Sequence, residues 1–295
     1  MTPTIEVRDL RVSFGEVTAL DGLSFSLSGN KIYGLVGRNG SGKTTLLSVL
    51  SAFRKAFSGS VLIDGQPVFE NGNVTRRLCF IRGPGDTIED SDKVHEALTF
   101  AEYMRPNWNS DRAAELLDAF EISPTVKIGA LSKGKRAGLG VTLGLASRAA
   151  VTMFDETYLG MDAPSRHMFY DELLADFMSA PRTFIVSSHL IEEMSRLFEE
   201  VVIIDRGRLV LHEEAERLRS LGAAVTGEER IVDRFVQNLP VLAVKRLGRT
   251  KSVTVYGTID GDRRAEALDA GLEVGPVAIQ DLFIHLTQPE VSDGS

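Results

Sequence analysis

The sequence predicts an α/β protein with a mainly parallel sheet, followed by a smaller α+β domain. Three observations predict this fold class. An apolar run at residues 31–36 leads into a glycine-rich loop and then into a helical pattern. Strand-like and helix-like segments alternate over residues 151–205, as in a parallel sheet with crossover helices. Beyond about residue 215, short strands and helices follow one another in a different order.

The apolar run and the loop are the clearest part of the first domain. Residues 31–36 read as a strand buried on both faces, and residues 44–53 carry leucines at helical spacing. Strand-like segments and helix-like segments surround this unit. The strands are expected at residues 4–7, 23–27, 60–63, 78–81, 151–154, 183–187 and 201–205, and the helices at 94–105, 111–120, 164–178 and 191–197. Ser110 is the candidate N-cap of the helix at 111–120.

The last eighty or so residues predict a β-α-β-β-α-β order, which is the pattern of a split βαβ, ferredoxin-like module. Strands are expected at residues 223–227, 241–247, 251–257 and 272–277, helices at 228–239 and 262–270, and a closing helix at 278–287.

Bulk composition excludes several classes of protein. The 295 residues are 43% hydrophobic and 25% charged, with a formal net charge of −8, which argues against a general binder of nucleic acid or anionic membranes. The single cysteine, Cys79, allows no internal disulfide and is expected to be a buried strand residue in a reducing compartment. We find neither a secretory signal nor an apolar run long enough to span a membrane. We therefore expect a cytosolic protein.

The glycine-rich loop GRNGSGKT, from Gly37 to Thr44, predicts a phosphate-binding P-loop. Its glycines allow backbone N–H groups to turn toward an anion, and the following helix directs its positive end at the same place. Lys43 supplies a cation for the β- and γ-phosphates, and the Thr44 hydroxyl is a ligand for Mg²⁺. A preceding strand and a following helix make this a strong signal for nucleotide binding.

Two further strand ends carry polar side chains that suit nucleotide hydrolysis. The strand at residues 151–154 ends in Asp155 and Glu156, which suit a carboxylate near Mg²⁺ and a base near the attacking water, respectively. The strand at residues 183–187 is followed by His189, which suits a contact with the γ-phosphate or with the water.

Together these motifs resemble the ATPase subunits of ABC transporters. The sequence LSKGK at residues 131–135 is similar to the signature loop of that family, whose usual form is LSGGQ. Asp162 stands at the position of the acidic residue of the D-loop, and Phe14 at that of an aromatic residue that stacks on adenine. The resemblance covers residues 4–215, and finer matches such as DETYLG point to the YtrB-like branch of bacterial export ATPases, of actinobacterial type.

The resemblance implies an ABC-type P-loop NTPase fold, with an N-terminal antiparallel β part, a parallel core sheet and a helical subdomain at about residues 84–150. It implies an ATPase domain at residues 1–218 and a C-terminal domain at 219–295. ATP and Mg²⁺ are the implied cofactors. Glu156, His189 and Lys43 are implied in catalysis, and Thr44 and Asp155 in holding the metal. The implied nucleotide-binding residues are Phe14, Gly37, Asn39, Gly40, Ser41, Gly42, Lys43, Thr44, Thr45, Ser132, Gly134 and Asp162.

The resemblance also implies partners. Two ATPase subunits, identical or related, close head to tail around two ATP molecules, each held between the P-loop of one subunit and Ser132 and Gly134 of the other. Closure drives a separate membrane permease, which implies a cytoplasmic protein held at the inner face of the membrane. Export is the implied direction, and no nucleic acid partner is expected.

The sequence departs from the family pattern in three places. The family has a glutamine after the strand at residues 78–81, where this chain has RGPGD and only Asp86 as a substitute. Lys133 and Lys135 replace the usual glycine and glutamine of the signature; Lys135 and Arg136 either add charge near the γ-phosphate or are solvated. Thr157 replaces the usual proline. Two alternatives stay open: a regulatory or scaffold subunit with weak turnover, and a soluble ABC ATPase acting on ribosomes or DNA.

Overall fold

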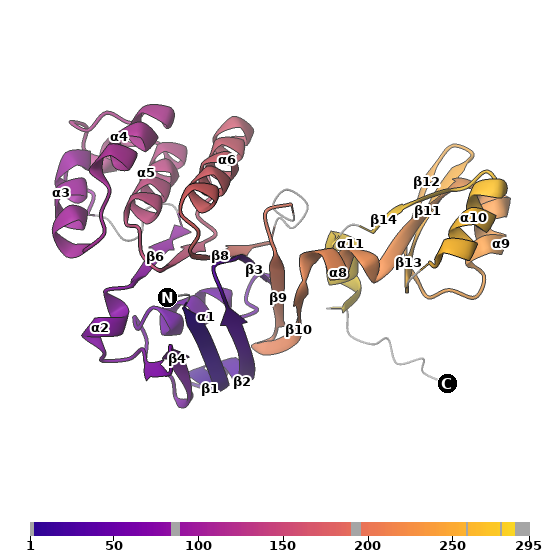
Figure 1. The fold of residues 1–295 in the computed structure, drawn as a ribbon, viewed down its shortest axis with the longest axis horizontal. Coiled ribbons are helices and arrows are strands. Elements are labelled where there is room, and N and C mark those ends of the chain that lie inside the picture. Colours follow the sequence, from indigo (N-terminus) through magenta and orange to yellow (C-terminus); the bar gives the residue numbers. More distant parts are fainter. Residues whose placement is uncertain (1–2, 84–88, 190–195, 258, 278, 287–295) are drawn as a thin grey trace. The chain divides into compact units, whose positions relative to one another are not determined.

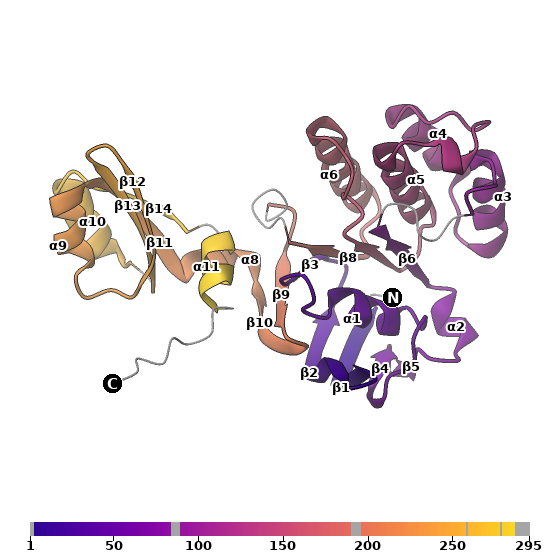
Figure 2. The ribbon, with the colours of Figure 1, turned by 180° about the vertical axis from the view of Figure 1, so that it is seen from behind.

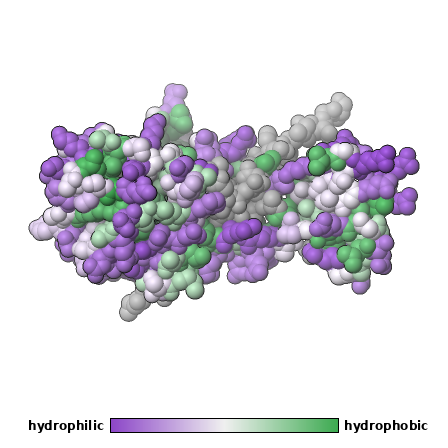
Figure 3. Space-filling view, turned by 90° about the horizontal axis from the view of Figure 1, so that it is seen from above, coloured by the Kyte–Doolittle hydropathy of each residue, from purple (hydrophilic) through white to green (hydrophobic). Residues whose placement is uncertain are grey.

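The computed structural model describes residues 3–83, 89–189, 196–257, 259–277 and 279–286. Within these ranges the chain forms two compact units, of which the first reaches as far as His212 and the second begins at Glu213. In Figures 1 and 2 the first unit is the part that contains β3, and the second unit is the part that contains β11. The surface seen in Figure 3 is mostly hydrophilic, with hydrophobic patches.

The first unit contains a six-stranded sheet whose central strands are parallel. Its order is β10-β9-β3-β8-β7-β6, and β3 pairs in parallel with both β8 and β9, as β7 does with β6 and β8. The strands are β3 (Ile32–Val36), β6 (Leu78–Arg82), β7 (Val151–Asp155), β8 (Thr183–Ser188), β9 (Glu200–Asp205) and β10 (Arg208–Glu214). Every residue of β3, β7 and β8 is buried, because such strands are covered on both faces. The predicted parallel core sheet is confirmed.

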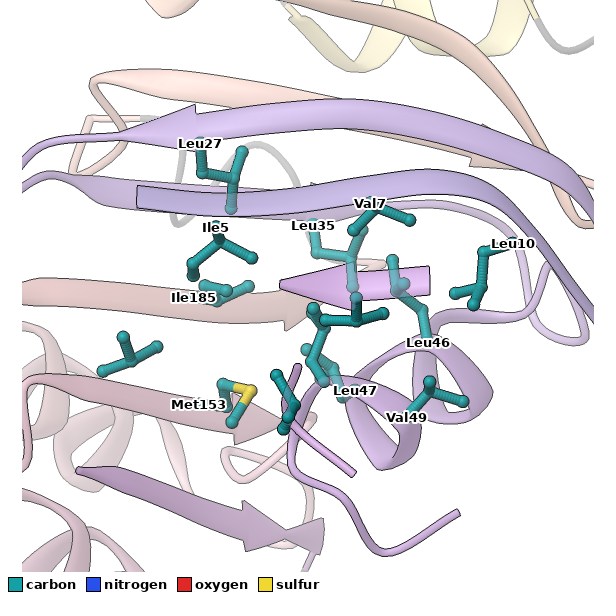
Figure 4. Close-up of a cluster of buried hydrophobic side chains, with 14 of the residues drawn as sticks. Ile5, Val7, Leu10, Leu27, Leu35, Leu46, Leu47, Val49, Met153 and Ile185 are labelled. Atoms are coloured by element: carbon teal, nitrogen blue, oxygen red, sulfur yellow. The ribbon is translucent and has the colours of Figure 1, made fainter. Parts of the chain in front are cut away.

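An antiparallel sheet forms the N-terminal part of the first unit, with the order β2-β1-β4-β5. Its strands are β1 (Thr4–Phe14), β2 (Val17–Ser28), β4 (Ser58–Ile63) and β5 (Gln66–Pro67). Helix α1 (Lys43–Leu50) shares one hydrophobic core with both sheets. Figure 4 shows Leu46 and Leu47 of α1 among core side chains such as Ile5 and Ile185. This packing fixes the start of α1, and with it the P-loop, against the ends of the core strands.

Most of the other helices of the first unit lie on the opposite side of the six-stranded sheet from α1, as Figures 1 and 2 show. They are α2 (Gly72–Thr75), α3 (Val94–Met104), α4 (Ser110–Ala119), the 3₁₀ turn η2 (Ile128–Ala130), α5 (Lys133–Ala146) and α6 (Ala163–Ser179). The predicted N-cap of α4 was wrong by one residue. Asn109 is the cap, and its side chain accepts a hydrogen bond from Arg112 N, whereas the hydroxyl of Ser110 donates to Glu102. The helix predicted at 191–197 lies largely outside the described residues.

The second unit has the predicted β-α-β-β-α-β order and a sheet with the order β12-β13-β11-β14. All of its strand pairs are antiparallel, which is the split βαβ arrangement of a ferredoxin-like module. Its elements are α8 (Ala215–Ser220), β11 (Gly222–Glu228), α9 (Glu229–Val236), β12 (Val241–Leu247), β13 (Thr250–Tyr256), α10 (Gly261–Asp269), β14 (Glu273–Pro276) and α11 (Ile279–Leu286). A separate hydrophobic core lies between the sheet and the two helices α9 and α10. The domain boundary expected at residue 218 falls within α8.

Candidate nucleotide-binding site

The P-loop joins the end of β3 to the start of α1, and two of its glycines are in the left-handed region. Gly40 has φ 79° and Gly42 has φ 106°. A Cβ atom on Gly42 would lie only 2.7 Å from the carbonyl oxygen of Ala19, so no larger residue fits there. Asn39 and Gly40 are exposed at the tip of the loop, as is Thr44 in the first turn of α1, while Thr45 is half-buried. The loop thus has the backbone form that anion binding requires.

Lys43 is folded back over the loop that precedes it. Its side chain is 5% exposed, and Nζ donates hydrogen bonds to the carbonyl oxygens of Gly37, at 2.8 Å, and Arg38, at 3.2 Å. The same Nζ lies 3.3 Å from Oε1 of Glu156. Ser41 Oγ is buried and has no hydrogen-bond partner among the described residues. A buried ammonium and a buried unpaired hydroxyl at one loop are the groups that a phosphate oxygen would satisfy.

Asp155 and Glu156 follow one another at the end of β7, and Ser187 of β8 holds both. Asp155 Oδ1 accepts a hydrogen bond from Ser187 Oγ at 2.6 Å, and the same hydroxyl accepts from the backbone N–H of Glu156 at 2.9 Å. Glu156 adopts a left-handed backbone conformation, with φ 47°. Side chains other than glycine, asparagine and aspartate rarely adopt this conformation, and functional sites are enriched in such strained residues.

His189 completes a chain of polar side chains that begins at Lys43. Its Nδ1 lies 3.2 Å from Glu156 Oε1 and 3.1 Å from the hydroxyl of Tyr158. The structure therefore brings three predicted residues, Lys43, Glu156 and His189, into direct contact from three different elements. Sequence reasoning missed two residues of this cluster, Ser187 and Tyr158. The sequence signal for Ser187 was its place at the end of the strand predicted at residues 183–187, and its pairing with Asp155 is visible only in the structure.

The signature loop packs against the turn that leads to Asp162. Ser132 is the N-cap of α5 and Asp162 is the N-cap of α6. A Cβ on Gly134 would lie 3.1 Å from the carbonyl oxygen of Gly160, so the two turns are in close contact. Hydrogen bonds from Ser165 lower the pKa of Asp162. Within the described ranges, no hydrogen bond or ion pair joins Ser132, Gly134 or Asp162 to the P-loop.

The basic residues of the signature are occupied by partners in their own subdomain. Lys135 Nζ donates to the carbonyl oxygen of Glu121 at 2.6 Å, and Arg136 forms an ion pair with Asp90. This observation favours neither of the two roles expected for them, because both side chains are already engaged within the chain.

Phe14 lies at the end of β1 and is 44% exposed. The guanidinium carbon of Arg54 lies 4.3 Å from the centre of its ring, which is the geometry of a cation–π contact. The ring is accessible enough to stack on a flat ligand.

The loop that lacks glutamine begins at Gly83, where a Cβ would lie 3.6 Å from the carbonyl oxygen of Asp155. Asp86 lies outside the described residues.

The predicted magnesium ligands suit an ion that is bound together with phosphate. The described residues hold no group of three or more histidine, cysteine or acidic side chains that could enclose a metal. Mg²⁺ is commonly held by one or two carboxylates together with substrate phosphates and water, which suits a site that offers one carboxylate, Asp155, and one hydroxyl, Thr44. Asp155 is 5% exposed and is oriented by Ser187, so its carboxylate is preorganised for such a role.

The comparisons with known proteins agree with this geometry. Residues 20–158 match the family model described as ABC transporter. The chain carries an ABC transporter ATPase domain over these residues. It is an ATP-binding and ATP-hydrolysing subunit of an ABC transporter. In the described residues, no helix is both long and apolar enough to cross a membrane.

Relatives of this ATPase are named as subunits of export and resistance systems. The Nod factor export ATP-binding protein I of Ralstonia nicotianae is 27% identical, covering 99% of this chain and 96% of that protein. The doxorubicin resistance ATP-binding protein DrrA of Mycobacterium tuberculosis is 29% identical, and the match covers 70% of this chain and 63% of DrrA. The ABC transporter ATP-binding protein YtrB of Bacillus subtilis is 27% identical, and the match covers 81% of this chain and 82% of YtrB. A solved ATP-binding subunit of an ABC transporter has the same fold, with a TM-score of 0.66 at 19% identity over 73% of this chain and 91% of that one.

Proposed function

We propose that this ATPase works as a dimer that closes on ATP and moves a separate membrane permease, in the direction of export. The contact of Lys43, Glu156 and His189 at the ends of three elements carries the proposal, because it supplies the cation, base and γ-phosphate contact that hydrolysis needs. The names of the relatives, which include Nod factor export and doxorubicin resistance, support export.

Each residue has a proposed part in this reaction. Lys43 binds the β- and γ-phosphates, and the N–H groups of the loop from Gly37 to Thr45 surround them. Glu156 accepts a proton from the attacking water, and His189 contacts the γ-phosphate. Phe14 stacks on adenine. Mg²⁺, held by Thr44 and Asp155, would supply charge neutralisation at the phosphates when it is bound.

A second subunit is proposed because the signature loop does not reach the P-loop of its own chain. Ser132 is the N-cap of α5, and its hydroxyl accepts a hydrogen bond from Lys135 N in the first turn. The N-terminus of a helix is suited to bind an anion. Facing the P-loop of another copy, Ser132 and Gly134 would add contacts to the γ-phosphate that exist only in the closed dimer. Such contacts give ATP a higher affinity for the closed state, which is what drives closure.

A hydrophobic cavity in the first unit is a suitable docking place for the permease. The cavity is about 630 Å³ in volume and is lined by residues of α3, β6 and the segment after α1. Phe53, Phe100 and Met104, which line it, are 69%, 66% and 53% exposed. Exposed apolar side chains of this size around one groove are typical of a site that receives an amphipathic helix. Binding there would place the ATPase at the cytoplasmic face of the membrane.

The test compares single-turnover ATP hydrolysis with ATP affinity in the full chain and in Glu156→Gln. The substitution keeps the size of the side chain and removes the base, so we expect hydrolysis to fall about 10²-fold or more while ATP still binds. If the unaltered chain, with its permease present, hydrolyses ATP no faster than Glu156→Gln, the proposal is wrong. Tight ATP binding with negligible hydrolysis in the unaltered chain would instead support the scaffold alternative.

A further inference from the structure

Tyr158 lies in the turn between β7 and α6, two residues after Glu156, and its side chain is only 1% exposed. Its hydroxyl is held at the end of β8. It accepts hydrogen bonds from the backbone N–H of His189 and from Ser188 Oγ, both at 3.2 Å, and it lies 3.1 Å from His189 Nδ1. The hydroxyl therefore contacts the backbone and the ring of the same histidine.

We propose that Tyr158 is a positioning residue that fixes both the place and the tautomer of His189. This inference rests on the proposed role of His189 at the γ-phosphate. A neutral imidazole carries one N–H, and only Nε2 is left to face a phosphate once Nδ1 is occupied. A phosphate oxygen is an acceptor, so His189 must present Nε2 with its hydrogen attached.

Glu156 and Tyr158 favour opposite tautomers of His189. The carboxylate of Glu156, 3.2 Å from Nδ1, can only accept, and it favours a hydrogen on Nδ1. The Tyr158 hydroxyl accepts from the N–H of His189 and from Ser188, and in the proposed arrangement it donates its own hydrogen to Nδ1, 3.1 Å away. That hydrogen bond makes Nδ1 the acceptor and leaves the hydrogen on Nε2. Tyr158 thus opposes the tautomer that has its hydrogen on Nδ1. In that tautomer, Nε2 has no hydrogen to donate to the phosphate.

A purely structural role would explain less of this geometry. A buried tyrosine hydroxyl needs a hydrogen-bond partner, and one carbonyl oxygen would suffice. Tyr33, for comparison, is 0% exposed, and its hydroxyl bonds the backbone N–H and carbonyl of Ser28. The Tyr158 hydroxyl instead contacts Ser188 and both the backbone and the ring of His189, beside the base Glu156.

Tyr158→Phe tests the proposal, because phenylalanine keeps the buried ring and removes only the hydroxyl. We expect kcat for ATP hydrolysis by the full chain to fall about tenfold or more, by analogy with metal-bound histidines that lose an orienting partner, with ATP affinity unchanged. In a His189→Ala background the same substitution should cause no further fall, because Tyr158 acts through His189. The ¹⁵N NMR signals of the His189 ring, assigned with the His189→Ala variant, should move from the Nε2–H toward the Nδ1–H form.

Tyr33→Phe is the matched control, since it also removes a buried, hydrogen-bonded hydroxyl but far along the chain from His189. It should lower the unfolding temperature and leave kcat unchanged. The inference is overturned if Tyr158→Phe keeps full kcat, or if it lowers kcat equally in the His189→Ala background. A chain that hydrolyses no ATP before any substitution, or whose kcat is unaffected by His189→Ala, would contradict the proposed function rather than the role of Tyr158.

Discussion

Asp176 of α6 is a buried carboxylate that three arginines surround. Its side chain is fully buried, and ion pairs join it to Arg182, to Arg148 at 3.2 Å and to Arg112 at 3.7 Å. Burial lowers the pKa of Arg182, and the charge of Asp176 opposes that shift. These arginines come from α4, from the turn after α5 and from the segment before β8, so one carboxylate connects the helical part of the first unit to its core sheet.

Asp176→Asn should therefore destabilise the first unit strongly, because it leaves the buried guanidinium of Arg182 without its counter-charge. We expect a loss of about 3–5 kcal/mol in the free energy of unfolding. Urea unfolding followed by the fluorescence of Trp108, the single tryptophan, reports on this unit. Glu172→Gln is the control, since that side chain pairs with Arg112 but is 26% exposed, and its removal should cost no more than about 1 kcal/mol. Equal losses in the two variants would contradict this account.

Cys79 and Glu156 show how differently single residues can be predicted from sequence. Cys79 was expected to be a buried strand residue; it lies in β6 at 2% exposure, and burial raises the pKa of its thiol. Glu156 was expected at a strand end, but nothing in the sequence predicts its positive φ. In that conformation its N–H donates a hydrogen bond to Ser187, a residue of another strand.

At the scale of elements, helix α5 packs closely on the core sheet through glycines. A Cβ on Gly144 would lie 2.5 Å from the ring of Phe154 in β7, and a Cβ on Gly140 would lie 3.0 Å from Ile81 in β6. The Phe154 ring has no freedom to move, because it is fully buried and packs edge-to-face on Phe169, with ring centres 5.3 Å apart. Glycine thus sets the separation between α5 and the sheet.

Gly144→Ala should destabilise the first unit by about 1–3 kcal/mol through overpacking, although alanine has the higher helix propensity. The control is Gly72→Ala in α2, where the added methyl group meets no atom within 4 Å. That variant should be as stable as the unaltered chain or up to about 1 kcal/mol more stable. Urea unfolding of both variants makes the comparison, and a Gly144→Ala chain of unaltered stability would show that α5 can shift.

Elements with a strong local pattern could be predicted from the sequence, and contacts between elements could not. The apolar run at residues 31–36 and the P-loop predicted β3 and α1, and the strand-like segments within residues 241–257 predicted β12 and β13. The N-cap of α4 was misplaced by one residue, because Asn109 and Ser110 are both good capping residues and only their contacts distinguish them. Tyr158 and Ser187 were missed because their roles depend on how β7 and β8 lie beside each other.

At the scale of the whole molecule, the central claim is that ATP joins two copies of this chain. The P-loop cluster and Ser132 both belong to the first unit, yet no described hydrogen bond or ion pair connects them. A site completed by a second copy needs both surfaces and needs ATP between them. Hydrolysis must then reopen the pair, so removal of the base should keep it closed.

Analytical ultracentrifugation of Glu156→Gln with Mg²⁺ and ATP tests this claim most directly. The account predicts a species of about twice the 32.2 kDa mass of the chain with ATP, and a monomer without it. Lys43→Ala added to the same variant should abolish the ATP-dependent dimer, because the phosphates lose their buried cation. A Glu156→Gln chain that binds ATP and yet remains monomeric at saturating nucleotide would contradict the account.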